Sequence, residues 1–428
     1  MVDDGYDTVP DRPVGATVAL VALVVTASAA VAEGFRRTAQ WAVELYAGTE
    51  SSTAAADELS PVLVAALVAT AVLVAAALGR RASRRWPGAS GLEAVAASAR
   101  GEPRRISATA TSDRVAAIWA VAAGLVSIGR ETAIIEAGGA VGAKAGRRTG
   151  GKGDAMAVAG IAAAFAAAYH APLAAMVYVE EHLRVRGSGR AVRFTVAGAV
   201  GGHLVAVGLL GGDALFPPLE GSRWALLIAG LAVAVPAAMT ARVFLRLRTA
   251  AAADGWRERL PSAGRHAVVV TAALVAGLAV ALAPDAAGNG MDGLRTVPVS
   301  ATVGLAVALV VGKIVGTTAA LAAGAPGGVI SPSMAIAGGA ALLVALGADA
   351  AGLAVDHPWD IVVAAMVVGV AVGLRSPIMA PLLVAELLGD YTLVPALAVV
   401  ALAAYAIDRL VDLVTRSRPS DKVHDEDA

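Results

Sequence analysis

Residues 127–143 read SIGRETAIIEAGGAVGA, which sets an arginine and two glutamates among small and apolar residues. Gly129 permits a turn, after which the amides of Arg130, Glu131 and Thr132 would open a helix. A helix that begins inside a membrane presents unpaired N–H groups and a partial positive charge to an anion. We therefore interpret this stretch as a re-entrant helix start that binds an anion.

Glu131 is itself an anion, so it can fill such a site, and protonation would release it. A carboxylate held within the membrane is costly and usually functional. We therefore expect Glu131 to act as both a gate and a proton acceptor. The structural alternative, an Arg130–Glu131 pair at a helix start, stays open at this point.

The composition favours a polytopic membrane protein, because 57% of the 428 residues are hydrophobic and 16% are charged. Seven apolar runs approach or reach the roughly 20 residues that span a bilayer as a helix: 15–33, 61–79, 192–211, 224–245, 266–283, 300–323 and 393–412. Shorter runs, broken by Gly or Pro, predict half-helices: 115–128, 156–168, 171–181, 334–347 and 379–387. The expected fold class is an all-α polytopic membrane protein with re-entrant half-helices.

The charge distribution predicts the topology. Loops with acidic residues and no Lys or Arg alternate with basic clusters, which we expect in the cytoplasm: Arg80–Arg85, Arg147–Lys152, Arg184–Arg190, Arg246–Arg248 and Arg416–Arg418. Both termini are then cytoplasmic, as tails of residues 1–14 and 413–428. The acidic start lacks the basic region of a cleavable signal, so the first helix should remain in the mature protein. The absence of cysteine excludes disulfides and thiolate sites.

An internal repeat in the sequence suggests two related halves. In APLAAMVYVEE (171–181) and SPIMAPLLVAEL (376–387) a glutamate follows a proline by nine positions. We expect inverted repeats over about 15–212 and 225–412, with a seam near 212–225. Transporters built from repeats place their sites at the repeat interface near the membrane midplane.

Two further stretches have the features of membrane-embedded helix starts. In WPGASGLEAVAASARG (86–101), Ser90 has the features of an N-cap, and its hydroxyl could also donate to an anion. In GAPGGVISPSMAIAGGA (324–340), two glycines would bare the amides of Val329 and Ile330. A plain loop between two spans is the alternative for the second stretch.

Three carboxylates remain to be assigned. Glu181 ends an apolar run beside its neighbour Glu180, just before a basic loop. An interfacial helix end is one interpretation, and a proton relay with Glu131 as the outer partner is the other. Glu136 and Glu386 are expected to be structural.

Two motifs resemble those of enzymes, but each is weak evidence for an enzyme. GRRTGGKG (146–153) has Gly153 where a phosphate-binding loop needs Ser or Thr, and no strand precedes it. GASG (88–91) fits the Gly-x-Ser-Gly of rhomboid-type intramembrane proteases, with His170 or His203 as a base. This serine protease is kept as the alternative from another class.

Taken in order, the motifs resemble the CLC family of chloride channels and chloride/proton antiporters. GASGLEAV is similar to the family's GSGIP segment, GRETA to its GREGP, and AAAFAAAYHAPLAAMVYVEE to its AAFNAPLAG…EE stretch. GAPGGVISP resembles the GxFxP-containing segment, and LRSPIMAPLLVAELLGDY the later RAPLTG…LEMTDNY stretch. The likeness covers roughly residues 15–412.

The resemblance implies roles for individual residues. Ser90, with Gly91 beside it, corresponds to the central-site serine, and Glu131, with Arg130 before it, to the external gating glutamate. Glu181 corresponds to the internal proton glutamate, and the amides of Val329 and Ile330 to those that coordinate the ion.

The resemblance also implies a function. It implies inverted repeats, a homodimer with one pore in each subunit, and transport of chloride and protons across the lipid bilayer. No enzyme activity, cofactor, metal or nucleic-acid partner is expected.

Departures from the family pattern qualify the expected activity. Thr132 and Ala133 replace Gly-Pro, Ile330 replaces Phe, and Glu93 replaces the Pro of GSGIP. The C-terminal tyrosine that caps the central site has no obvious counterpart. We therefore expect a loosely coupled chloride/proton antiporter, with a passive chloride channel and a fluoride/proton antiporter as alternatives.

Overall fold

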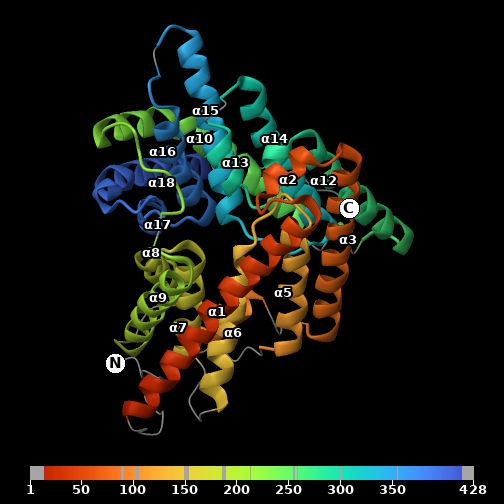
Figure 1. The fold of residues 1–428 in the computed structure, drawn as a ribbon, viewed down its shortest axis with the longest axis vertical. Coiled ribbons are helices and arrows are strands. Elements are labelled where there is room, and N and C mark those ends of the chain that lie inside the picture. The colour runs from red at the N-terminus through yellow and green to blue at the C-terminus, as the bar shows by residue number, and fades with distance from the viewer. Residues whose placement is uncertain are drawn as a thin grey trace, which may run out of the picture.

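The computed structural model describes residues 14–87, 91–100, 102, 106–148, 154–185, 189–212, 214–253, 256–257, 259–298, 301–353 and 355–416. Over these residues the chain is predominantly helical (Figure 1). Seven of the described helical segments are long and apolar enough to cross a membrane. The expected all-α polytopic class is confirmed.

The first half contains nine α-helices among its described residues. They are α1 (Val14–Ala47), α2 (Ser52–Glu58), α3 (Pro61–Arg85), α4 (Leu92–Ala99), α5 (Ala108–Ala123), α6 (Glu131–Arg148), α7 (Asp154–Tyr169), α8 (Pro172–Val177) and α9 (Gly189–Leu210). A π-helix, Tyr178–His182, continues α8.

The second half begins at Arg223, within the stretch 212–225 in which the seam was expected. Its helices are α10 (Arg223–Ala252), α12 (Ser262–Leu282), α13 (Met291–Thr296), α14 (Val303–Ala323), α15 (Ile330–Ala350), α16 (Pro358–Leu374), α17 (Met379–Leu388) and α18 (Val394–Arg416). Short 3₁₀ segments precede α13 and α18, at Pro284–Ala286 and Tyr391–Leu393. Figure 1 shows α10, α15, α16 and α18 gathered in one group, with α8 and α17 meeting between the halves.

Two helices differ from the expectation. The run 334–347 belongs to a full 21-residue helix, α15. Pro332 does not break it, because Pro332 lies in the first turn, where no backbone N–H is needed. Helix α16, whose 17 residues are fewer than a span usually needs, was not among the expected elements.

Glycines let α6 and α7 approach closely. A Cβ on Gly138 would lie 2.4 Å from the Gly160 carbonyl oxygen, and one on Gly142 would lie 1.9 Å from the Met156 carbonyl oxygen. Without a hydrophobic driving force between helices in lipid, such close packing is a main source of helix association. These glycines therefore fix the position of α6, whose first residue is Glu131.

An ion-pair cluster joins α10 to α18. Arg242, which is 8% exposed, contacts the carboxylates of Asp408 and Asp412. Arg375 donates to Asp412 over 2.8 Å. The buried charge of Arg242 is thus paired, as burial requires.

Candidate anion and proton site

The first turns of α6 and α15 meet at two glycines. The Gly328 amide donates to the Gly129 carbonyl oxygen over 2.7 Å, just before the two helices begin. A Cβ on Gly129 would lie 2.7 Å from the Gly328 oxygen, so this approach requires glycine. Two helix N-termini, one from each half, therefore direct their partial positive charge to one place.

Glu131 fills this junction. Its side chain is 4% exposed, and Oε1 accepts hydrogen bonds from Ser331 Oγ over 2.5 Å and from Asn289 Nδ2 over 3.0 Å. Oε2 is buried with no hydrogen-bond partner among the described residues. The carboxylate thus stands where a helix-terminus site would hold an anion.

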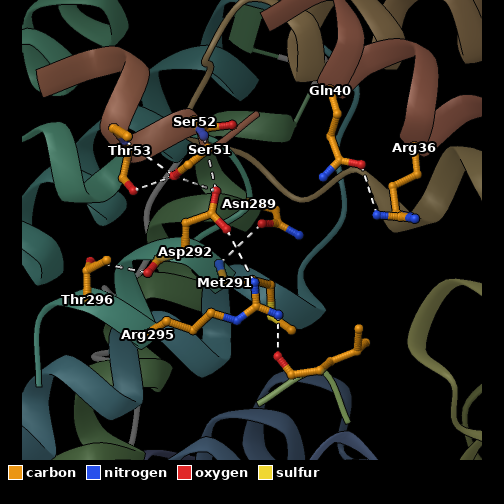
Figure 2. A network of polar contacts seen from close by, with 12 residues as sticks. Arg36, Gln40, Ser51, Ser52, Thr53, Asn289, Met291, Asp292, Arg295 and Thr296 are labelled. Carbon is orange, nitrogen blue, oxygen red and sulfur yellow. Dashed lines mark hydrogen bonds and ion pairs between the residues drawn. The ribbon is translucent and has the colours of Figure 1, made fainter. Parts of the chain in front are cut away.

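A loop over the junction holds Asn289 in place. Its Oδ1 accepts from the Met291 amide over 3.2 Å, while the Asp292 carboxylate accepts from the Ser52 amide over 3.1 Å (Figure 2). The Gly288 oxygen accepts from the Ile128 amide over 3.0 Å. The loop is therefore tied both to the start of α2 and to the segment before Glu131.

A buried lysine supports the same loop from α14. Lys313 is fully buried, and its Nζ donates to the oxygens of Gly288 over 2.6 Å and Ala286 over 3.1 Å. An ionisable residue within a membrane span is a functional candidate by default, and Lys313 holds the loop that carries Asn289 beside Glu131.

On its other side Ser331 faces a tyrosine. Tyr169 ends α7, is 2% exposed, and has its hydroxyl 3.4 Å from Ser331 Oγ. Glu131, Ser331 and Tyr169 thus form a chain of groups that can accept and donate protons.

The other expected anion ligands lie as follows. Ser90 lies outside the described residues. The Gly91 amide donates to Glu136 Oε1 over 2.8 Å, and Arg114 Nε lies 3.3 Å from Oε2 of the same carboxylate. Gly91 therefore differs from the expectation, because its amide is occupied by Glu136, and Glu136 acts as the structural group at the start of α4.

Arg130 and Val329 are half-buried and directly precede α6 and α15. Ile330 is buried and is the first residue of α15. The first amides of a helix have no partner within it. The start of α15 therefore presents backbone donors next to the Glu131 carboxylate.

Glu181 lies apart from this junction, in the π-helix Tyr178–His182. Its two oxygens accept from the amides of Ile378 over 3.2 Å and Met379 over 2.9 Å, at the start of α17. Glu386 in α17 does the same for α8, accepting from Leu173 over 2.8 Å and Ala174 over 2.9 Å. In the internal repeat, each glutamate thus caps the start of the corresponding helix in the other half.

The junction contains three side chains that sequence reasoning missed: Asn289, Lys313 and Ser331. Lys313 carried a usable signal, because it is the lone charge within the apolar run 300–323. Asn289 and Ser331 carried none, since each is a common residue whose importance depends on a distant partner.

The fold and the junction define a class: a polytopic membrane protein with re-entrant helices whose N-termini converge on a buried carboxylate, the architecture of an ion transporter. A family profile described as "Voltage gated chloride channel" matches residues 71–409. The chain belongs to this family, in agreement with the resemblance noted above.

Individual relatives agree with this assignment. The chain is 28% identical over 335 residues to a protein named "H(+)/Cl(-) exchange transporter ClcA" from Vibrio campbellii (strain ATCC BAA-1116), covering 72% of this chain and 69% of the relative. It is also 28% identical over 334 residues to the ClcA of Vibrio vulnificus (strain YJ016), covering 72% and 70%.

Solved structures share the fold. A "slow cyanobacterial Cl-/H+ antiporter" aligns with a TM-score of 0.73 at 18% identity, covering 95% of this chain and 99% of that one. A "CLC-type fluoride/proton antiporter" aligns with a TM-score of 0.71 at 17% identity, covering 94% and 98%. The inverted-repeat, re-entrant fold expected from the sequence is confirmed.

Replacing Ser331 by alanine should weaken the hold on the Glu131 carboxylate. One hydrogen bond to a charged group contributes about 1.5–3 kcal/mol, or roughly ten- to a hundredfold in an equilibrium. We expect faster chloride flux and fewer protons moved per chloride, measured in liposomes. Ser333→Ala is the matched control, because Ser333 is fully buried in the same helix and its hydroxyl has no partner among the described residues. Equal effects from both variants would contradict the assigned contact.

Proposed function

We propose that this protein exchanges chloride for protons across a membrane. One observation carries the proposal: the buried Glu131 carboxylate stands at the junction of two helix N-termini, in the position of an anion. A carboxylate that competes with the transported anion leaves that position most readily when it is protonated. Anion entry and proton uptake are then linked through one residue.

In the proposed cycle, a proton on Glu131 removes its attraction for Lys313 and the helix termini. The neutral side chain moves aside, and chloride occupies the junction, where the first amides of α15 and the Asn289 amide can donate to it. When Glu131 loses its proton, the carboxylate returns and displaces the anion. When the proton arrives from the side to which chloride leaves, and departs to the side from which chloride came, one turn of this cycle moves the two ions in opposite directions.

We further propose that coupling is loose. Tyr405, the nearest candidate for the missing central tyrosine, lies over the guanidinium of Arg409, with its ring centroid 5.6 Å from the Arg409 Cζ. An anion that lacks this hydroxyl should leave the central site more easily before the gate closes. A proton-to-chloride ratio that varies with the imposed pH gradient would support loose coupling.

Chloride gradients imposed on liposomes that contain the purified protein test the proposal, with anion and proton movement recorded together. Uphill proton movement driven by chloride supports exchange, whereas anion flux that ignores pH indicates a passive channel. Fluoride in place of chloride tests the remaining alternative. We propose no enzyme activity, and labelling of Ser90 by a fluorophosphonate probe would contradict this.

We also propose that the protein is a homodimer in the cell membrane, with both termini in the cytoplasm. The chain has no cysteine, so a single cysteine introduced near either end would report its side without background. Protection of both positions from an impermeant thiol reagent in intact cells is the expected result. The dimer is tested by measuring the particle mass in detergent and in lipid nanodiscs.

A further inference from the structure

Glu181 has a structural task that limits it as a mobile proton carrier. Both of its oxygens accept backbone amides of α17, as both oxygens of Glu386 accept amides of α8. Protonation of either carboxyl would turn an acceptor into a donor beside the N–H groups of the helix start that it caps. The symmetry of the two caps indicates that Glu181, like Glu386, joins the two halves.

The next residue offers a different titratable group. His182 ends the π-helix and is half-buried, with Nδ1 3.2 Å from the Leu374 carbonyl oxygen. A carbonyl only accepts, so this hydrogen bond assigns the proton to Nδ1 and leaves Nε2 as a proton acceptor. Single-turn π-helices of this kind often mark functional sites.

A column of side chains leads from His182 to the gate. The His182 ring stacks on Tyr178 at 5.0 Å between centroids, Tyr178 lies 4.6 Å from Phe165, and Phe165 lies 5.0 Å from Tyr169. Tyr169 then reaches Glu131 through Ser331. The column therefore connects the π-helix to the Glu131 carboxylate, first through ring contacts as far as Tyr169 and then through hydroxyl contacts.

We propose that His182 is the inner proton acceptor of the exchange cycle, and that protons pass between it and Glu131 beside this column. A proton binds Nε2 to give an imidazolium, leaves it for a bridging water, and ends on the Glu131 carboxylate. Water carries the proton past the Phe165 ring, and the hydroxyls of Tyr169 and Ser331, which lie 3.4 Å apart, each accept one proton and give up another, so neither changes charge. This inference rests on the proposed exchange activity and identifies the residue at the inner end of its proton path.

Several charged side chains surround the imidazole. Glu180 and Glu181 share its turn, and Arg100 donates to the neighbouring Leu183 carbonyl oxygen over 2.9 Å. The charges that act on the ring from other segments are those of Arg184, Arg248 of α10 and Glu93 of α4. The His182 and Tyr169 variants leave all of these charges in place, since a change in any of them would alter the same titration.

The test compares His182→Gln with His182→Glu in liposomes. Glutamine retains a donor for Leu374 but cannot titrate, so chloride-driven proton pumping should fall by about tenfold or more while chloride flux persists. Glutamate should restore pumping and move its pH dependence to lower pH, since a carboxyl titrates below an imidazole. Tyr169→Phe, which keeps the ring packing, should also lower proton pumping with chloride flux retained.

Glu181→Gln and Glu386→Gln form the matched pair for the caps. We expect both to lower the melting temperature and both ion fluxes together, to similar degrees. Loss of proton pumping in Glu181→Gln alone, with normal pumping in His182→Gln and Tyr169→Phe, would overturn the inference. Glu181 would then be the inner proton acceptor, and the proposed exchange function would still stand. Absence of coupled transport in the unmodified protein would instead contradict the proposed function.

Discussion

Glu131→Gln should abolish chloride-driven proton transport and leave passive chloride movement. Glutamine keeps an oxygen that can accept from Ser331 and Asn289, so the junction retains its packing and its hydrogen bonds. It carries no charge and does not titrate, so the link between gate position and protonation is lost. Proton flux should fall to the level of empty liposomes, while chloride flux no longer depends on pH.

Glu136→Gln is the control for this experiment. Glu136 lies in the same helix and is 1% exposed, but it holds the start of α4 rather than the junction. We expect it to lower stability and to keep proton coupling. Uphill proton pumping by Glu131→Gln would show that the gate is another residue.

The second large effect concerns folding rather than transport. Gly142→Ala should prevent the close approach of α6 and α7, because the added Cβ would lie 1.9 Å from the Met156 carbonyl oxygen. Backbone cannot rotate away as a side chain can, so the helices must separate. We expect a loss of at least about 3 kcal/mol, the upper range for overpacking.

Gly208→Ala makes the same change in α9, where an added Cβ meets no atom within 4 Å. It should match the unmodified protein or be slightly more stable, since alanine favours a helix. Folded yield and melting temperature in detergent measure both variants. A stable, well-expressed Gly142→Ala protein would contradict the packing described for α6.

Local patterns were enough to predict six of the seven helices that are long and apolar enough to span a membrane, since six of the predicted apolar runs correspond to them. Glu131 was conspicuous because a charge between apolar segments is costly in a membrane. Helix α15 was expected to be shorter because Gly338 and Gly339 resembled breaks. In the fold they pack against Leu294 and Val310, so tertiary contacts replace what local propensity lacks.

The partners of the gate could not be predicted in this way. Ser331 lies 200 positions from Glu131 in the sequence, and Asn289 lies 158 positions away. The similar patterns around Glu181 and Glu386 revealed a repeat. They could not show that each glutamate caps a helix of the other half, which lies 197–213 positions away in the sequence. Such contacts depend on how the halves pack, which no local pattern encodes.

Chloride/proton exchange is tested most sharply by the reversal potential of net flux in liposomes that contain only this protein, at several fixed pH gradients. Exchange through Glu131 predicts that the reversal potential moves away from the chloride equilibrium value in the direction set by the pH gradient. In Glu131→Gln it should return to the chloride value at every pH. If the reversal potential of the unmodified protein stays at the chloride equilibrium value whatever the pH gradient, the protein does not exchange chloride for protons.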